Sequence, residues 1–382
     1  MDSLTARRGE SSVACVPLAE ALTQDAAAWD RLVVRSPGVS PFAGWAWHRA
    51  WATTAPGAEL EASYALLLRN DAGVVDAVLP VGVREILFRR QRVRALTWAI
   101  GDVGCPDHLD VPALPEADLR AMVPALWALR WDVLILSNLA ADARNARRLA
   151  TALAESGAAV RSAAVSDCPH LELPASWEEY LASLSANRRH RLRREERHLQ
   201  RDHAVVVTDY DGDRVEEGWR RLVALHEQRW EGAGAFRDRR VEELHRCFAQ
   251  ELSRRGTLWL TTLDVDGQPA AAWYGFADQD TVYFYQSGRD PRRDHESVGL
   301  VLMAMMIRRA IERGFRWFDF LRGDEAYKKD WTKARRVTSE LVAFRPTWRG
   351  QWLRGLDLAG RLRVRLLARP PREPSRSDAV GA

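Results

Sequence analysis

The 382-residue chain has only four cysteines, and they are widely separated. Cys15, Cys105, Cys168 and Cys247 form no CxxC pair, which argues against a zinc ribbon or a disulfide framework and suits a reducing compartment. The N-terminal segment MDSLTARRGESSVACVPL lacks the apolar core of a signal peptide. The longest apolar run, at 298–307, is half the length that a bilayer span needs. These absences predict a cytoplasmic protein.

Several catalytic signatures are also missing. The sequence has no GxSxG nucleophile turn, no Walker A loop and no HExxH helix. The segment GCPDHLD does place Cys105, Asp107, His108 and Asp110 close together. Four potential ligands so near in sequence seldom form a metal site without a matching turn geometry. We therefore predict that the protein holds no metal.

Positive charge is concentrated at one end of the chain. Nine arginines face three acidic residues from Phe344 to Ala382, although the whole chain carries only +4. The remainder is slightly negative, so a global nucleic-acid footprint is not supported. Segment 346–369 interleaves tryptophan and leucine with arginine, which predicts a basic amphipathic helix. Such a helix either docks on its own domain or makes weak contact with an anionic membrane.

The length of the chain predicts two domains, at 13–173 and 174–345, because one core rarely serves so many residues. Both halves alternate strand-like and helix-like segments, and strand 336–344 is expected to close the second half. Sixteen tryptophans provide rings for cores and clefts. We predict an α/β (α+β) fold with two tandem halves, each a mixed central sheet flanked by helices. The end segments 1–12 and 370–382 are predicted to be disordered.

The most informative arrangement is a strand, a loop, a helix and a second strand between residues 280 and 321. The loop GRDPRRDHESVGL connects strand 281–287 to helix 297–313. A helix N-terminus offers free N–H groups and partial positive charge, which suit a pyrophosphate. The alternative is a solvated loop that leads into an ordinary helix.

The next strand carries Asp319, within FDFLRGDEAYKKDW. A carboxylate on a half-buried strand needs a partner, and Lys328, Lys329 or an arginine is expected to provide it. Asp319 is then either half of a buried salt bridge that fixes the loop or a base beside a cleft. The arginine-rich helix at 185–201 also has two interpretations, a solvated face with internal ion pairs or a phosphate-contacting face.

These motifs together resemble a known family. LSANRRHRLRREERHL, DVDGQPAAAWYGF and FDFLRGDEAYKKDW resemble the CelD-like acetyltransferases, a branch of the GNAT superfamily with a FemAB-like duplicated architecture. PFAGWAWHRAW and GDVGCPDHLDVP resemble the first half of that branch, so the likeness covers roughly residues 13–345. Its strongest motif, G-x-E/D-x-Y-K-x-x-W, is formed here by Gly323, Glu325, Tyr327, Lys328 and Trp331.

The resemblance implies acyl transfer from acetyl-CoA or another acyl-CoA to a small-molecule or saccharide-linked amine, and the branch is often linked with exopolysaccharide or cellulose production. The pyrophosphate would bind the N-terminus of helix 297–313, and the pantetheine arm would pass between strands 281–287 and 316–321. The superfamily loop Q/R-x-x-G-x-G/A is absent, since HESVGL keeps one glycine. Two alternatives stay open: a FemAB-like transferase that uses aminoacyl-tRNA, and an inactive scaffold or nucleic-acid-binding relative.

The resemblance also assigns roles to residues. Asp319 is the predicted base or orienting group, Tyr327 the acid and Lys328 a local charge holder, while backbone N–H groups near Tyr285–Ser287 stabilise the oxyanion. The predicted donor-binding residues are Tyr285, Ser287, Arg289, Arg292, Ser297 and Gly299. The predicted substrate-binding residues are Trp273, Tyr274, Arg188 and Glu325.

Overall fold

A computed structural model of the chain describes residues 12–36, 39–231, 233–323 and 325–367. The predicted disordered segments lie outside these ranges, except for Ser12, which begins the first strand. Within the described ranges, no helix is both long enough and apolar enough to cross a membrane.

Twelve strands form one sheet with the order β1-β2-β3-β4-β5-β12-β6-β11-β10-β9-β8-β7. The strands are β1 (Ser12–Pro17), β2 (Ser63–Arg69), β3 (Val75–Phe88), β4 (Gln91–Trp98), β5 (Val133–Leu139), β6 (Ala159–Glu172), β7 (Val205–Asp209), β8 (Leu258–Val265), β9 (Gln268–Asp278), β10 (Thr281–Arg289), β11 (Trp317–Asp319) and β12 (Arg335–Phe344). The predicted hairpin at 63–85 is confirmed by β2 and β3, and the predicted meander by β8, β9 and β10.

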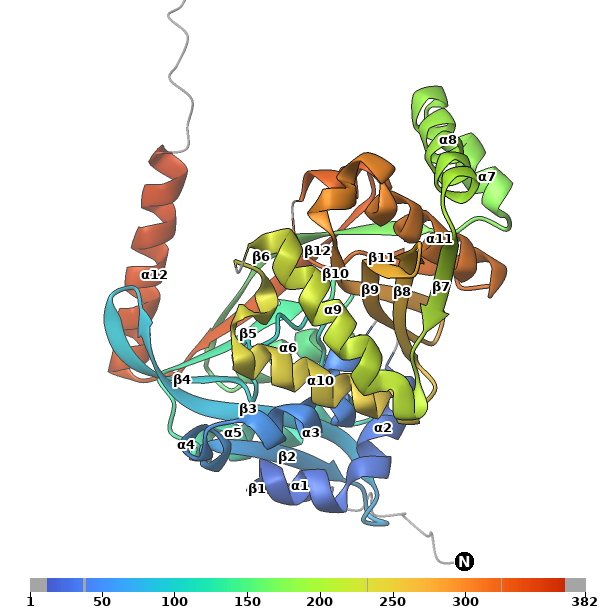
Figure 1. The fold of residues 1–382 in the computed structure, drawn as a ribbon. Coiled ribbons are helices and arrows are strands. Elements are labelled where there is room, and N and C mark those ends of the chain that lie inside the picture. The colour runs from blue at the N-terminus through green and yellow to red at the C-terminus, as the bar shows by residue number, and fades with distance from the viewer. Residues whose placement is uncertain (1–11, 37–38, 232, 324, 368–382) are drawn as a thin grey trace, which may run out of the picture.

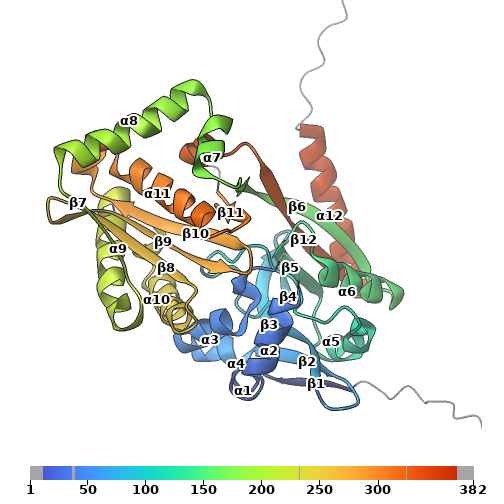
Figure 2. The same ribbon diagram turned by 90° about the vertical axis from the view of Figure 1, so that its right-hand side faces the viewer.

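The two halves of the sheet repeat one layout. Strands β1–β4 are antiparallel and β5 runs parallel to β4, while β7–β10 are antiparallel and β11 runs parallel to β10. The α-helices are α1 (Leu18–Gln24), α2 (Ala26–Val34), α3 (Trp45–Thr54), α4 (Gly57–Glu61), α5 (Val123–Ala128), α6 (Arg144–Glu155), α7 (Trp177–Ser183), α8 (Ala186–Asp202), α9 (Val215–Trp230), α10 (Arg239–Arg254), α11 (Val298–Glu312) and α12 (Trp348–Leu367). In the second half, α9 and α10 cover one face of the sheet and α11 with α8 covers the other (Figure 2). This layout confirms the predicted α/β fold with tandem halves.

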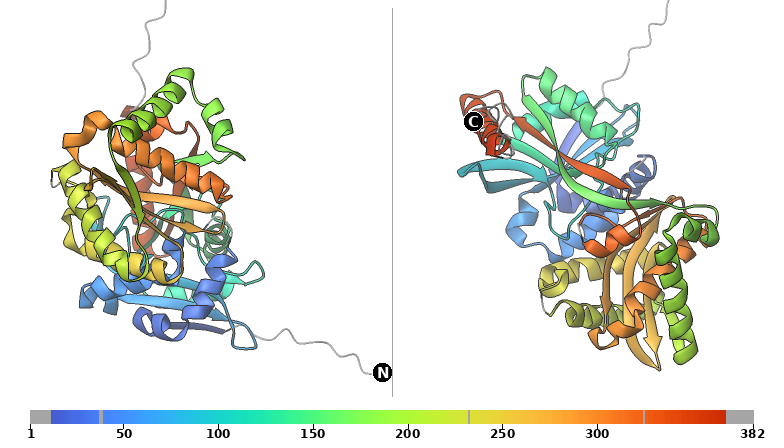
Figure 3. Two further views of the ribbon diagram at one scale, coloured as in Figure 1. Left: turned by 45° about the vertical axis from the view of Figure 1, so that its right-hand side comes forward. Right: turned by 90° about the horizontal axis from the view of Figure 1, so that it is seen from above.

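The strands β6 and β12 form a ribbon that joins the halves (Figure 3). β12 lies between β5 and β6 and pairs with both. The prediction that strand 336–344 closes the second half is therefore wrong, because this strand completes the sheet of the first half. β6 pairs with β12 along most of its length and with β11 at its end, so one strand belongs to both halves.

The hydrophobic core also crosses between the halves. Phe42 and Trp47, from the first half, pack against Phe248 of α10 with ring centroids 6.1 Å and 5.0 Å away. Phe42 also contacts Phe276 of β9 at 5.3 Å. Each fully buried aromatic side chain contributes roughly 1.5–3 kcal/mol. The two halves consequently hold each other in a fixed relative position.

Candidate active site

The candidate site lies where β10 and β11 separate. Their parallel pairing ends at Tyr283 and Asp319. β10 continues to Arg289, with a bulge that leaves Tyr285 opposite no residue of β9. β11 stops, and Leu321 takes a left-handed φ of 55° that turns the chain away. A β-bulge re-aims backbone groups beside a site, so this geometry is compatible with the predicted oxyanion donors near Tyr285.

A cavity of about 310 Å³ opens beside this separation, between β10, α8 and the N-terminus of α11. We call it the α11 cavity; its lining residues are Arg188, Arg191, Arg229, Ala272, Trp273, Ser287, Gly288, Arg289, Asp294, Ser297, Val298, Gly299, Leu300, Leu302, Met303, Tyr327, Asp330 and Trp331. Seven predicted site residues meet here: Arg188, Trp273, Ser287, Arg289, Ser297, Gly299 and Tyr327.

Close contact between α9 and β10 brings Arg229 into the α11 cavity. A Cβ on Gly288 would lie 2.4 Å from the backbone nitrogen of His226, so only glycine allows this approach. One turn further along α9, the Nη1 of Arg229 donates a hydrogen bond to Ser287 Oγ at 2.6 Å. Arg229 was not among the predicted residues.

The α11 cavity is electropositive, with four arginines against Asp294 and Asp330. Arg289 pairs with Asp294 at 2.6 Å, and Arg188 pairs with Asp330 at 3.1 Å. Among the described residues, no carboxylate forms an ion pair with Arg229. Burial lowers the pKa of Arg229 and the like charge of Arg289 lowers it further, while Tyr327 and the more distant Glu325 raise it in part. Arg229 is half-buried, and a partly desolvated cation without a paired carboxylate favours an anionic ligand.

A further set of hydrogen-bond donors lies at the cavity, and one buried donor belongs to a residue of its wall. The first turn of α11 has free N–H groups, and the side chain of Ser297 at its N-cap makes no capping bond. Trp273 is almost fully buried, and its Nε1 has no hydrogen-bond partner. Together with Arg229, these groups could hold phosphate oxygens and the amide groups of an extended donor.

Tyr327 lies on the same cavity wall as Arg229, whose guanidinium carbon is 5.5 Å from the centre of its ring. Burial raises the pKa of the Tyr327 hydroxyl, Glu325 raises it further, and Arg229 opposes both. The hydroxyl therefore stays protonated at neutral pH. In that state it can donate a hydrogen bond or a proton, as predicted for the acid.

Asp319 is fully buried and does not line the α11 cavity. Its Oδ1 accepts the N–H of Leu321 at 2.8 Å, and its Oδ2 lies 3.2 Å from His108 Nε2 and 3.9 Å from Arg336. Burial alone would raise the pKa of Asp319, but His108, Leu321 and Arg336 together lower it. Asp319 thus holds the exit of β11, as in the salt-bridge alternative, and it is not among the residues that line the cavity.

Lys328 and Glu325 shape the loop after β11. Lys328 is only 4% exposed, and its Nζ donates to the carbonyl of Arg322 at 2.8 Å and pairs with Glu325 at 2.9 Å. Gly323 has a φ of 128°, a backbone conformation that strains residues with a side chain, which explains the glycine of the motif. Neither Lys328 nor Glu325 lines the α11 cavity. The motif therefore builds the loop that positions Tyr327.

The segment GCPDHLD supplies the partners of this loop rather than a metal site. His108 pairs with Asp319, and Asp107 accepts the backbone N–H of Arg322 at 2.9 Å. Asp110 instead accepts two backbone N–H groups at the start of α6. Within the described part of the chain, no group of His, Cys, Asp and Glu side chains could hold a metal ion.

Tyr285, Tyr274 and Arg292, three further predicted residues, also lie outside the α11 cavity. The side chain of Tyr285 packs 3.9 Å from the ring of His245 and donates to the carbonyl of Gly104 at 3.1 Å. Tyr274 is buried on the α9 face of β9, opposite to Trp273, because neighbouring strand residues point to opposite faces.

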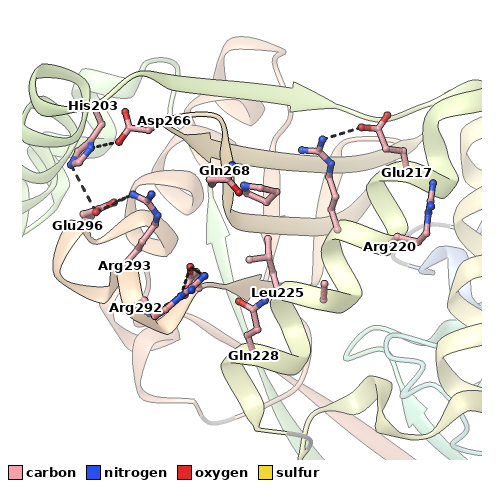
Figure 4. A pocket seen from close by; sticks show the side chains of 14 residues that line it. His203, Glu217, Arg220, Leu225, Gln228, Asp266, Gln268, Arg292, Arg293 and Glu296 are labelled. Atoms are coloured by element: carbon pink, nitrogen blue, oxygen red, sulfur yellow. Dashed lines mark hydrogen bonds and ion pairs between the residues drawn. The ribbon is translucent and has the colours of Figure 1, made fainter.

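Arg292 lines a second cavity of about 1010 Å³ between α9, the turn from β8 to β9, and η5, which spans Pro291–Glu296 (Figure 4). Its guanidinium pairs with Asp290 at 2.9 Å. Arg293 pairs with Glu296, and His203 pairs with Asp266, so the charges of this cavity largely neutralise each other. This makes it less suited to a polyanionic donor than the α11 cavity.

Comparison with known proteins identifies the second half. Residues 186–329 match the family model described as an acetyltransferase (GNAT) domain. No curated protein matches the chain. Among solved structures, FemX is similar with a TM-score of 0.57 and 12% identity, over 88% of this chain and 98% of that one.

Two further structures share the fold. A conserved protein of unknown function from Bacteroides thetaiotaomicron has a TM-score of 0.54 and 12% identity, over 88% of this chain and 100% of that one. The other is the C-terminal domain of a protein from Agrobacterium fabrum that is named as a lysylphosphatidylglycerol synthetase. It has a TM-score of 0.53 and 12% identity, over 89% of this chain and 97% of that one. Residues 186–329 therefore form an acetyltransferase domain of the GNAT type, and the chain that contains it is an acyltransferase.

Proposed function

We propose that this chain transfers an acyl group from acyl-CoA to an amine and that the α11 cavity binds the donor. The observation that carries the proposal is Arg229, a half-buried arginine without an ion-pair partner among the described residues, which lines the same cavity as the N-terminus of α11. Phosphate groups would supply the missing negative charge.

The residues of the α11 cavity fit such a donor. Arg229 and Arg191 would bind phosphate oxygens together with the first turn of α11, and Trp273 Nε1 would bind a carbonyl of the pantetheine arm. When bound, the donor supplies a reactive thioester. The chain positions the amine, whose nitrogen bonds to the thioester carbonyl carbon as the C–S bond breaks. Tyr327 donates its proton to the departing thiolate and regains one from the nitrogen that has become the amide.

The donor can be tested by isothermal titration with acetyl-CoA and longer acyl-CoAs. We expect micromolar affinity, and about a tenfold or larger loss in Arg229→Gln, because a hydrogen bond to a charged group is worth about 1.5–3 kcal/mol. The matched control is Arg220→Gln, which changes an exposed arginine of the second cavity. No binding to any acyl-CoA, or equal losses in both variants, would contradict the proposal.

Aminoacyl transfer from aminoacyl-tRNA is the second candidate. The likeness to FemX and to the domain of a protein named as a lysylphosphatidylglycerol synthetase supports it. So does α8, where Arg191 at the cavity mouth and the exposed Arg197 have no carboxylate partner among the described residues. Transfer of a labelled amino acid from tRNA, with no binding of acyl-CoA, would decide for this candidate.

We also propose membership of the CelD-like branch and an acceptor that is a small-molecule or saccharide-linked amine. Support comes from the motif, since Gly323, Glu325 and Lys328 pack together as one loop that positions Tyr327. Screening amines with a thiol-release assay tests the acceptor, and acylation of hydroxyl compounds alone would contradict it.

A further inference from the structure

The C-terminal helix α12 is docked on the first half of the protein by one side only. Leu353 is buried beside Val93 and Phe344. Four residues along the chain, Asp357 is buried and pairs with Arg161 at 2.7 Å and Arg89 at 2.9 Å. The predicted docking of the tail helix on its own domain thus has a defined contact. Figure 1 shows that the rest of α12 stands at the margin of the molecule.

The opposite side of α12 exposes large apolar side chains. Trp348 is 80% exposed, Trp352 45%, Leu358 43% and Leu362 58%. At 100° per residue these four positions span about 120° of the helix and face away from Leu353. A stripe of this size is not explained by contacts within the described chain.

Arginines surround this apolar side. A cavity of about 310 Å³ between α12 and β6 is lined by Arg161, Arg354 and Arg361, with Leu358 and Phe344 as its apolar wall. No carboxylate lines it. Arg354 makes its hydrogen bond to the neutral side chain of Gln351 at 3.4 Å. Arg161 already pairs with Glu340 and Asp357, and Arg361 pairs with Asp357 at 3.1 Å. Arg354 is therefore the cation of this cavity without a carboxylate partner among the described residues, and it lies beside the exposed Leu358.

We propose that α12 lies on a membrane surface rich in anionic phospholipid. Its tryptophan and leucine side chains would enter the interfacial layer, and the cavity lined by Arg161, Arg354 and Arg361 would hold a phosphate headgroup. Tryptophan and leucine on one side with arginine at the margins is the composition of helices that bind anionic interfaces.

Charge favours a membrane over a second copy of this chain. Among residues 348–362, the only acidic side chain is Asp357, and it is buried. An isologous contact through α12 would therefore place arginines against the same arginines. An anionic lipid surface complements both the charge and the exposed rings. The proposal does not depend on which acyl donor the protein uses.

Vesicle flotation of the full chain tests the proposal. We expect the protein to float with phosphatidylcholine vesicles that contain phosphatidylglycerol, to stay unbound with phosphatidylcholine alone, and to be released by high salt. Arg354→Glu should weaken binding about tenfold, and replacing Trp348 and Trp352 together by alanine should abolish it. These side chains are exposed, so the melting temperature should not change.

Arg237→Glu is the matched control, since it reverses an exposed arginine of the other half. Unchanged binding in this control and lost binding in Arg354→Glu support the proposal. It is overturned if the chain floats with neither vesicle, or if the tryptophan variant binds as well as the unmodified chain. A dimer that the tryptophan variant dissociates would also overturn it, as would full displacement from vesicles by inorganic phosphate at an ionic strength at which chloride leaves the protein bound.

Discussion

Replacing Gly288 by alanine should damage both stability and donor binding, because the glycine lets α9 lie against β10. The added Cβ would lie 2.4 Å from the nitrogen of His226 and 2.5 Å from the carbonyl carbon of Leu225. Ordinary contacts are about 1 Å longer, so the backbone of α9 must move by about that amount. Inserting a methyl group into a packed position of this kind costs about 1–3 kcal/mol.

The same movement would disturb the site. Arg229 follows His226 by one helical turn, and a 1 Å shift would lengthen its 2.6 Å bond to Ser287 beyond hydrogen-bonding distance. We expect donor affinity to fall about tenfold or more. Urea unfolding measures the stability, and titration with acyl-CoA measures the affinity. Gly355→Ala is the control. A Cβ added to this exposed glycine of α12 would meet no atom within 4 Å, so alanine should raise the free energy of unfolding by up to about 1 kcal/mol. Unchanged stability and affinity in Gly288→Ala would refute the reasoning.

Three other perturbations have defined outcomes. Burial lowers the pKa of His245 to about 3, despite its bond to Gly104, so the unfolded chain gains a proton first as pH falls below 6.5. Between neutral pH and pH 4.5, the free energy of unfolding in urea should fall by about 3 kcal/mol more in the unmodified chain than in His245→Gln, where His48 and His226, with pKa values lowered to about 4, still contribute; an equal fall in both would contradict this. Burial lowers the pKa of His108, but Asp319 raises it above the ordinary value, so the His108–Asp319 pair stabilises the fold fully below pH 6.5 and less as pH rises. His108→Gln should therefore lose about 3–5 kcal/mol of unfolding free energy at pH 6 and less at higher pH, and a loss that does not change with pH would contradict this. Tyr327→Phe should lower kcat/KM at least tenfold while donor affinity stays the same, and a change within about threefold would remove its role as the acid.

Much of the candidate site could be predicted because its residues are close in sequence. Strand β10, the loop after it and the first turn of α11 follow one another, so Ser287, Arg289, Ser297 and Gly299 were found together and all line the α11 cavity. The alternation of β8–β10 and the spacing of α11 also identified these elements. Local periodicity predicts which face a side chain takes.

The failures concern partners that are distant in sequence. The alternation of apolar and polar residues along 335–344 predicts which face of the sheet each side chain takes, but it does not predict the neighbouring strands. The position of this strand between β5 and β6 therefore could not be predicted. The same applies to Asp319: the need for a partner was evident, but lysines in the same loop were nearer in sequence than His108. GCPDHLD, noted for its possible ligands, could have suggested that partner.

The sequence alone determined tandem α/β halves, a helix N-terminus suited to an anion and a basic tail, because each follows from local pattern and composition. The GNAT-like assignment came from the resemblance of its motifs to a known family. Tertiary structure decided which of these residues meet. The close packing of α9 against Gly288 places Arg229 at the α11 cavity, and the packing between the halves places His108 beside Asp319. Docking of α12 leaves its tryptophans exposed. The physical reason is that long-range contacts depend on how whole elements fit together, which no local pattern encodes.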